Sequence, residues 1–328
     1  MSTVVAAWTK VIVDYAASRG LDVRRPDVDL SRPDERIPSH LDDAIWASAV
    51  ARLGDDVGLQ LAETSVSVSS FGMLGYLLRA SATVGEALLR VHQYHRLAKD
   101  RARIELLWSP AGVTVVESPC PERGSWPRAI AECVLANYVH MARGWSGVRL
   151  TPLEVRFQHP RPRSARELER FFGCRVRFDA GENALVFTHE TLAVPFVTAE
   201  PLLAQYLTAM ASGRLEELRP EGGGVVDEVR LAITAELRGG GDEPSLSIGR
   251  VARRLGATPR SLQRRLRAEG VSYRELVDAV RHRRAIELVQ RGIPSHDIAD
   301  QLGFSEPRAF RRAFRRWTGI LPSALRRA

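Results

Sequence analysis

The chain has 328 residues, a length that indicates two domains, and its 45% of hydrophobic residues is typical of a globular protein and excludes a disordered one. Lys and Arg number 47 against 39 Asp and Glu, and the whole surplus of +8 lies at one end of the chain. Residues 221–328 hold 21 Arg and 13 acidic residues, whereas residues 1–220 balance to zero. We therefore expect an anionic partner, nucleic acid first of all, for the last third alone.

Three further features of the composition exclude whole classes. No uninterrupted apolar stretch approaches the roughly 18 residues of a membrane span. Lys10 and Asp14 interrupt an N-terminal pattern that also lacks the basic start of a secretory signal. Cys120, Cys133 and Cys174 are odd in number and form no C-x-x-C pair, so reduced thiols of a cytosolic protein explain them better than disulfides or zinc. We expect a cytoplasmic protein with no membrane partner, metal or cofactor.

The first 220 residues alternate helical and strand-like patterns. Apolar residues at helical spacing predict helices over 4–15 and 45–53. Alternation over 104–108 and a β-branched run over 113–116 predict two strands joined by a turn. The other predicted elements are a helix that starts at the capping-box pair Thr83 and Glu86, a helix over about 126–143, a strand near 155–157, a short helix capped by Ser164 and Glu167 that reaches Phe172, a strand over 184–187 and a helix over 201–218. Together they predict an α+β domain.

A break in the pattern follows at Pro220-Glu221-Gly222-Gly223-Gly224, where three glycines after a proline leave little to pack. We place the domain boundary there, between domains 1–220 and 221–328. The second domain is predicted to be all-helical, beginning with a helix over 225–237 that ends at Gly239-Gly240-Gly241.

Two segments within the second domain, 251–267 and 298–316, resemble one another. Each has a short helix of the pattern aliphatic-Ala-x-x-Leu-Gly, a hydroxyl residue at the expected N-cap (Thr258 or Ser305), a proline in the next helical turn and then an arginine-rich helix. Glycine tolerates the left-handed conformation that ends the first helix, and the hydroxyl accepts hydrogen bonds from free amides of the second. This arrangement predicts two helix-turn-helix units.

The second helix of each unit is predicted to have an apolar face and a basic face. Leu262 and Leu266 in one unit, like Phe310 and Phe314 in the other, lie four residues apart and are expected in the core. The same helical spacing makes Phe304 and Trp317 core residues rather than a base-stacking set. The opposite faces carry side chains suited to bases and phosphates, namely Arg260, Gln263, Arg264, Arg267, Arg308, Arg311, Arg312 and Arg315.

A long apolar-patterned helix over about 273–289 is predicted between the two units. It would hold both readers at a fixed separation, so that each enters one of two successive major grooves, which recur about every 34–36 Å along one face of DNA. One chain would then cover two adjacent turns of the duplex.

At this point the sequence resembles the double helix-turn-helix of AraC/XylS-type bacterial transcription regulators. The stretches 298–305 and 310–319 and the proline at 322 match that signature nearly position by position; only Ala309, where the family often has an aromatic residue, departs from it. The resemblance implies base reading by Arg260, Gln263, Arg264, Arg308, Arg311 and Arg312. It implies phosphate contacts by Thr258, Arg267, Ser305, Arg315 and Arg316.

The first 220 residues resemble the arabinose-binding-like effector domain that some of these regulators carry. The resemblance rests on the segments 71–78, 84–88, 94–96, 170–174 and 183–187. It implies a helix-rich sensor unlike the all-β cupin sensor of other branches, and the label does not establish a sugar ligand. The predicted chain is thus an α+β sensor followed by an all-α double helix-turn-helix DNA-binding domain. Apolar candidates for an effector pocket are Phe71, Leu74, Tyr76, Trp108 and Trp126, although the core is the more usual place for each.

Several smaller features have competing interpretations. His92 and His95 are three residues apart, but no carboxylate or Cys nearby completes a metal site. Cys174 is expected to be a buried structural thiol, and Gly72 and Gly75 to permit close helix packing rather than ligand contact.

Three functions remain open at this stage. The first is a transcription regulator that responds to a small-molecule effector, an activator by resemblance and then a partner of RNA polymerase. The second gives domain 1–220 only a role in self-association, as a homodimer. The third is an enzyme with an accessory DNA module, such as the methyl-accepting DNA-repair proteins, which need a four-cysteine metal cluster; this chain has three scattered cysteines. We therefore expect no enzymatic activity, and the sequence leaves effector and operator open.

Overall fold

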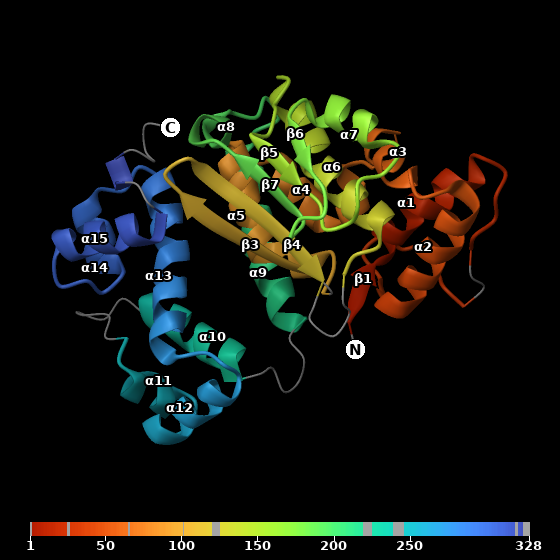
Figure 1. The fold of residues 1–328 in the computed structure, drawn as a ribbon. Helices are drawn as coiled ribbons and strands as arrows, with labels where there is room; N and C mark the ends of the chain where they lie inside the picture. Colours follow the sequence, from red (N-terminus) through yellow and green to blue (C-terminus); the bar gives the residue numbers. More distant parts are fainter. Residues whose placement is uncertain are drawn as a thin grey trace. The chain divides into compact units, whose positions relative to one another are not determined.

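The computed structural model describes residues 2–24, 27–64, 66–100, 102–119, 125–218, 225–238, 246–318 and 321–323. They form two compact units, an N-terminal one that ends at Leu218 and a C-terminal one that follows it (Figure 1). The expected boundary between residues 220 and 221, with its glycines, lies outside the described residues. Within these ranges no helix has the length and apolar character needed to cross a membrane.

The N-terminal unit has the predicted α+β composition. Its helices are α1 (Ala6–Ala17), α2 (Ser39–Leu53), α3 (Val57–Thr64), α4 (Met73–Arg79), α5 (Val84–Tyr94), α6 (Arg128–Ser146), α7 (Ala165–Phe172), α8 (His189–Ala193) and α9 (Pro201–Glu217), with 3-10 turns η1 (Val68–Phe71) and η2 (His95–Leu97). Its strands are β1 (Thr3–Val5), β2 (Arg36–Pro38), β3 (Ala102–Ser109), β4 (Gly112–Pro119), β5 (Glu154–Arg156), β6 (Arg175–Arg177) and β7 (Ala184–Phe187).

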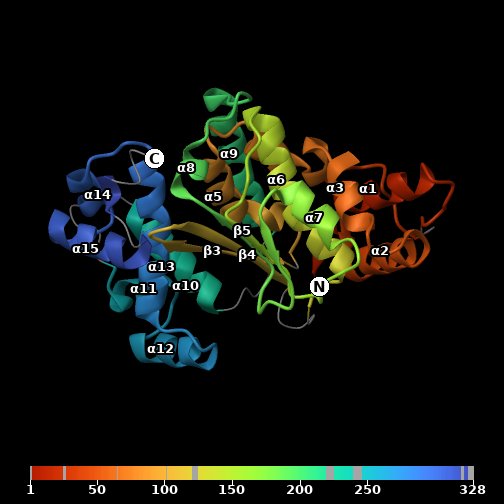
Figure 2. The same ribbon diagram turned by 45° about the horizontal axis from the view of Figure 1, so that its top comes forward.

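A five-stranded sheet in the order β3-β4-β7-β5-β6 organises this unit. Strand β7 is antiparallel to both of its neighbours, with Val113 opposite Phe187, while β5 and β6 run parallel. All four residues of β7 are buried, as expected for a central strand that is covered on both faces. Helices α5 and α6 lie against one face of the sheet (Figure 2).

The predicted elements are found, with differences at their ends. Thr83 caps α5 as predicted, because its hydroxyl accepts a hydrogen bond from the amide of Glu86 at 3.2 Å. Val4 and Val5, however, belong to strand β1, because they pair antiparallel with Ile37 and Arg36 of β2. Ser164 precedes α7 without a side-chain cap, and its hydroxyl instead accepts from Arg128 at 2.7 Å and donates to a carboxylate oxygen of Asp56 at 2.5 Å.

Close packing between η1 and α4 depends on glycine. A Cβ atom at Gly75 would overlap the carbonyl oxygen of Val68, and Gly72 has a φ of +55°, which L side chains rarely adopt. The packing role predicted for these glycines is confirmed at Gly75.

The C-terminal unit is helical in the described ranges. Its helices are α10 (Val225–Arg238), α11 (Ile248–Arg254), α12 (Pro259–Ala268), α13 (Tyr273–Gln290), α14 (Ser295–Gln301) and α15 (Pro307–Thr318). The expected glycine stop of α10 lies outside those ranges.

Helix α13 serves two small cores. Leu276, Val277 and Val280 in its first half pack in a cluster with buried residues of α10, α11 and α12. Its second half buries Leu288 and Val289 and lies next to α14 and α15. The 18 residues of α13 form a rod of about 27 Å, and Figure 1 shows the α11–α12 and α14–α15 pairs at its two ends.

Candidate DNA-binding surface and effector cavity

The first helix pair, α11 and α12, forms a tight helix-turn-helix. Gly256 has a φ of +64°, which ends the first helix, and the amide of Ala257 donates to the carbonyl of Ala252 at 2.9 Å. The Thr258 hydroxyl accepts from the amide of Ser261 at 3.2 Å and so caps α12.

The second pair, α14 and α15, repeats the glycine turn, with Gly303 at φ +66°. Helix α15 begins at Pro307, so Glu306 occupies the position before it, and Ser305, expected at the N-cap, lies one residue earlier. The carbonyl of Glu306 accepts from the amides of Ala309 and Phe310 at 3.0 and 3.2 Å. The two units therefore match in their turns and differ by one residue in their caps.

Helices α12 and α15 have the predicted division into faces. Leu262, Leu266, Phe310 and Phe314 are all 0% exposed. Phe304 and Trp317, also expected in the core, are only half-buried. The opposite faces are exposed and consist of Arg260, Gln263, Arg264 and Arg267 on α12 and Arg308, Arg311, Arg312, Arg315 and Arg316 on α15.

Ion pairs separate these exposed arginines into two kinds. Arg265 pairs with Glu228 of α10 at 3.1 Å, and Arg316 pairs with Asp278 of α13 at 2.9 Å. No acidic side chain in the described part of the unit pairs with the other arginines of the two faces, namely Arg260, Arg264, Arg267, Arg308, Arg311, Arg312 and Arg315. Their charge is available to phosphates or bases, whereas Arg316, predicted to contact a phosphate, already has a partner.

Arg281 holds the second unit against α13. Its Nε donates to the carbonyl of Leu302 at 2.8 Å and its Nη2 to the carbonyl of Gly303 at 2.6 Å. The guanidinium carbon lies 4.4 Å from the ring centroid of Phe304. Burial lowers the pKa of Arg281 from its ordinary value, yet it meets the carbonyl end of α14, where a cation is favoured. Sequence reasoning missed it because it lies outside both repeated segments.

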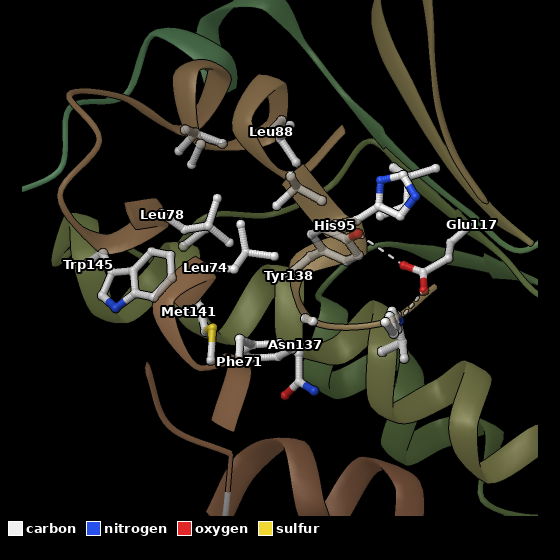
Figure 3. A pocket seen from close by; sticks show the side chains of 18 of the residues that line it. Phe71, Leu74, Leu78, Leu88, His95, Glu117, Asn137, Tyr138, Met141 and Trp145 are labelled. Carbon is white, nitrogen blue, oxygen red and sulfur yellow. Dashed lines mark hydrogen bonds and ion pairs between the residues drawn. The ribbon is translucent and has the colours of Figure 1, made fainter. Parts of the chain in front are cut away.

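A cavity lies within the N-terminal unit, between the sheet and helices α4, α5 and α6 (Figure 3). The empty space among its lining side chains totals about 760 Å³, a figure that includes the part open to solvent. Its lining consists of Phe71, Leu74, Leu78, Val84, Ala87, Leu88, Val91, His95, Ala98, Lys99, Ile104, Glu117, Val134, Asn137, Tyr138, Met141, Ala142, Trp145, Phe187 and Phe196.

The charged groups of this cavity gather at one end. The Glu117 carboxylate is 1% exposed, forms an ion pair with Lys99 and accepts from the Tyr138 hydroxyl at 3.0 Å. His95 lies beside Glu117 in Figure 3, and its Nδ1 is 3.1 Å from the carbonyl oxygen of His92. Burial raises the pKa of Tyr138 well above its ordinary value and lowers that of His95, so both side chains are uncharged at neutral pH.

Two of the five pocket candidates line the cavity. Phe71 and Leu74 do so, whereas Tyr76 is 45% exposed because it lies on the other face of α4. Trp108 and Trp126 are half-buried and are not among its lining residues. The contribution of α6 and the polar end were missed. Two signals were present: Lys99 is one of only two lysines, and Glu117 is a carboxylate that directly follows a β-branched run.

The comparisons with known proteins agree with this architecture. Residues 17–196 match the model of the arabinose-binding domain of AraC transcription regulators, N-terminal part, and residues 251–328 match a helix-turn-helix domain. The chain belongs to the AraC family of transcription regulators. It is 31% identical to the ornithine utilization regulator of Pseudomonas aeruginosa over 99% of this chain and 96% of that protein.

Other relatives of this AraC-family regulator are also named as transcriptional regulators. The transcriptional regulator VirS of Mycobacterium tuberculosis is 26% identical over 85% of this chain and 81% of its own length. The crystal structure of the regulator CdpR from Pseudomonas aeruginosa covers 97% of both chains with 27% identity and a TM-score of 0.49. The resemblance predicted from the sequence is confirmed: this is a helix-turn-helix transcription regulator with an arabinose-binding-like effector domain.

The structure also places two of the cysteines and the side chain of His92. Cys174, expected to be buried, is half-buried, because it follows α7 at the surface end of β6, and desolvation raises the pKa of its thiol to about 11. Cys133 is buried, with a pKa raised by burial to about 12; Cys120 lies outside the described residues. The Nδ1 atom of His92 lies 2.7 Å from the carbonyl oxygen of Ile104.

Proposed function

We propose that this regulator activates transcription by placing α12 and α15 in two successive major grooves of one DNA duplex. The observation that supports this most is the matched pair of exposed faces, each rich in arginines without acidic partners and each backed by fully buried side chains. Helix α13, a rod of about 27 Å, joins the two helix pairs and holds them apart. Domain 221–328 is thus the DNA-binding domain, and domain 1–220 is the effector domain.

The side chains of the two faces have two roles, base reading and phosphate contact. Arg264 of α12 and Arg312 of α15 read bases, together with Arg260, Gln263, Arg308 and Arg311; a paired hydrogen bond to a base is worth about 1–3 kcal/mol of discrimination. Arg267 and Arg315 contact phosphates, with Thr258 and Ser305 near the helix starts. Arg316 would have to give up Asp278 to reach a phosphate.

The test is fluorescence anisotropy with the full chain and a duplex selected by it from random DNA. Arg264→Ala is expected to relax the base preference at its position by about 1–3 kcal/mol. Arg315→Ala is expected to weaken all sequences alike and to reduce the slope of log affinity against log salt by about 0.9. Arg265→Ala is the matched control, because the neighbouring Arg265 is held by Glu228 and points elsewhere.

Equal losses for Arg264→Ala and Arg265→Ala on every sequence would contradict base reading by α12. A wild-type footprint confined to one groove would contradict the double contact.

We propose that the cavity of the N-terminal unit binds the effector. Its supporting features are the apolar walls and the cluster of Lys99, Glu117 and Tyr138 at one end. An effector changes the DNA-bound population only through unequal affinity for two states of the chain. Thermal melting of the full chain with a bound effector is expected to shift upward, and Leu74→Trp, which fills the cavity, is expected to abolish that shift. We further propose that the activated chain contacts RNA polymerase and has no catalytic activity.

Self-association is a second role for the N-terminal unit. Three apolar side chains at intervals of four on α9 are largely exposed, Leu202 at 66%, Tyr206 at 65% and Met210 at 62%. Exposed apolar stripes of this kind mark protein contacts, and we propose a homodimer through this face. Sedimentation of Tyr206→Glu against wild type tests it: a dimer is expected to become a monomer, and an unchanged sedimentation coefficient would contradict the proposed face.

A further inference from the structure

The cavity has two chemically distinct ends. In Figure 3 the side chains of Leu74, Leu78 and Met141 gather on one side, and those of His95 and Glu117 lie on the other. Fifteen of the twenty lining residues have aliphatic, aromatic or methionine side chains. Among these fifteen, only Trp145 has a hydrogen-bonding group, its indole N–H. A bound molecule would therefore touch apolar surface along most of its length and charged groups at one end only; the uncharged amide of Asn137 is a further polar lining group, beside Phe71 in Figure 3.

The polar end carries no net charge. Lys99 and Glu117 contribute opposite charges and form an ion pair with each other, at 12% and 1% side-chain exposure. His95 is neutral at pH 7 because burial lowers its pKa. A ligand with a single charge would bring an uncompensated charge into this largely buried site, which is unfavourable. An uncharged ligand meets no such penalty.

The same groups retain hydrogen-bonding capacity for a ligand. The Lys99 ammonium has three N–H donors, of which Glu117 takes one. His95 Nδ1 faces the carbonyl of His92 and must be the donor there, so in the neutral ring Nε2 is left as an acceptor. A hydroxyl group can both accept from Lys99 and donate to His95 or Glu117, and a carbonyl can accept from Lys99.

We propose that the cavity binds an uncharged, largely apolar molecule with one polar end, a hydroxyl or carbonyl group, which is held by Lys99, Glu117 and His95. This inference rests on the proposed effector role of the cavity and names the chemical class of the effector. This ligand class differs from the sugar that the label of the domain implies. A sugar has hydroxyls on every side, and most of them would face the apolar walls without partners. L-Ornithine carries a net charge of about +1 at neutral pH, which would be uncompensated at a site with no net charge.

The experiment is isothermal titration calorimetry of the full chain with three ligands that share one alkyl body: 1-octanol, octanoate and octylamine. L-arabinose and L-ornithine are tested beside them. At pH 7.5, 1-octanol is expected to bind more than about tenfold tighter than either charged analogue, because only the charged heads unbalance the ion pair. The two polar molecules are expected to give no measurable heat of binding.

Two variants make the charge argument specific. Glu117→Gln leaves the Lys99 ammonium uncompensated, so the affinity for octanoate relative to that for 1-octanol is expected to rise by more than about tenfold. Lys99→Met leaves the Glu117 carboxylate uncompensated, so octylamine is expected to gain instead. A merely structural role for the ion pair would weaken all three ligands together. The wild-type ranking stands as a test even if a variant fails to fold.

The outcomes separate this inference from the proposed function. Tighter wild-type binding of octanoate, octylamine, L-arabinose or L-ornithine, abolished by Leu74→Trp, would overturn the ligand class and leave the cavity as the effector site. Binding of 1-octanol that survives Leu74→Trp, or no binding of any of the five, would overturn both.

Discussion

Replacing Arg281 by Met is expected to loosen the second helix-turn-helix while leaving the first intact. The change removes two charge-assisted hydrogen bonds, of 2.8 and 2.6 Å, from the carbonyls of Leu302 and Gly303, and the contact with the ring of Phe304. Such bonds are worth about 1.5–3 kcal/mol each. Water can replace part of the loss at half-exposed Gly303, and methionine keeps much of the apolar stem. We therefore expect a local loss of about 2–4 kcal/mol.

Hydrogen exchange of the full chain measures this loss element by element. Amides of α14 and α15 are expected to exchange about 30- to 700-fold faster in Arg281→Met, since about 1.4 kcal/mol corresponds to a factor of ten. Arg316→Met is the matched control: it also joins α13 to α15, but its ion pair with Asp278 is exposed at 58% and 33%, so its removal is expected to cost less than about 1 kcal/mol.

Two results would refute this reasoning. Protection of α14 and α15 that falls no further in Arg281→Met than in Arg316→Met would show that the Arg281 hydrogen bonds do not hold the unit. Equal loss in α11 and α12 would show that the clamp is not local.

Three further predictions concern the N-terminal unit. Burial raises the pKa of Glu132 from 4.5 to about 7, so its contribution to stability is full below pH 4.5 and is lost as the pH rises through about 7. In denaturant titrations, the free energy of unfolding of Glu132→Gln is therefore expected to rise by about 3 kcal/mol relative to that of wild type between pH 4.5 and 7.5. A difference that stays constant with pH would contradict the shift. Gly75→Ala is expected to cost about 1–3 kcal/mol because its methyl group meets the carbonyl of Val68, whereas Gly144→Ala, with open space around it in α6, is expected to stabilise by up to about 1 kcal/mol in the same thermal melts; equal effects would refute the overlap. With its pKa at about 11, Cys174 is expected to react with iodoacetamide at pH 8 about a hundredfold more slowly than free cysteine, as followed by mass spectrometry; a rate close to that of free cysteine would contradict the shift.

Features set by neighbours close in the sequence were predictable. The glycine turns, the Thr258 cap and the burial of Leu262 and Leu266 all follow from residues within two helical turns of one another. The same local signals repeat about 47 residues later, so the double unit is identifiable from its residue pattern alone. Where one residue shifts the frame, as between Ser305 and Pro307, the local signal placed the cap one position too early.

The cavity and the supporting contacts depend on tertiary packing. The apolar residues of α4 look alike in sequence, and only their packing separates Leu74, which lines the cavity, from Tyr76, which is exposed. Lys99 and Glu117 are 18 residues apart and meet because η2 and strand β4 bring them together. In the same way β6, three residues with one buried valine, is a strand only because β5 lies beside it. The family, the two helix-turn-helix units and the basic faces follow from the sequence, because periodicity and caps act over a few residues. Which distant side chains meet follows from folding, because such contacts depend on how whole elements pack.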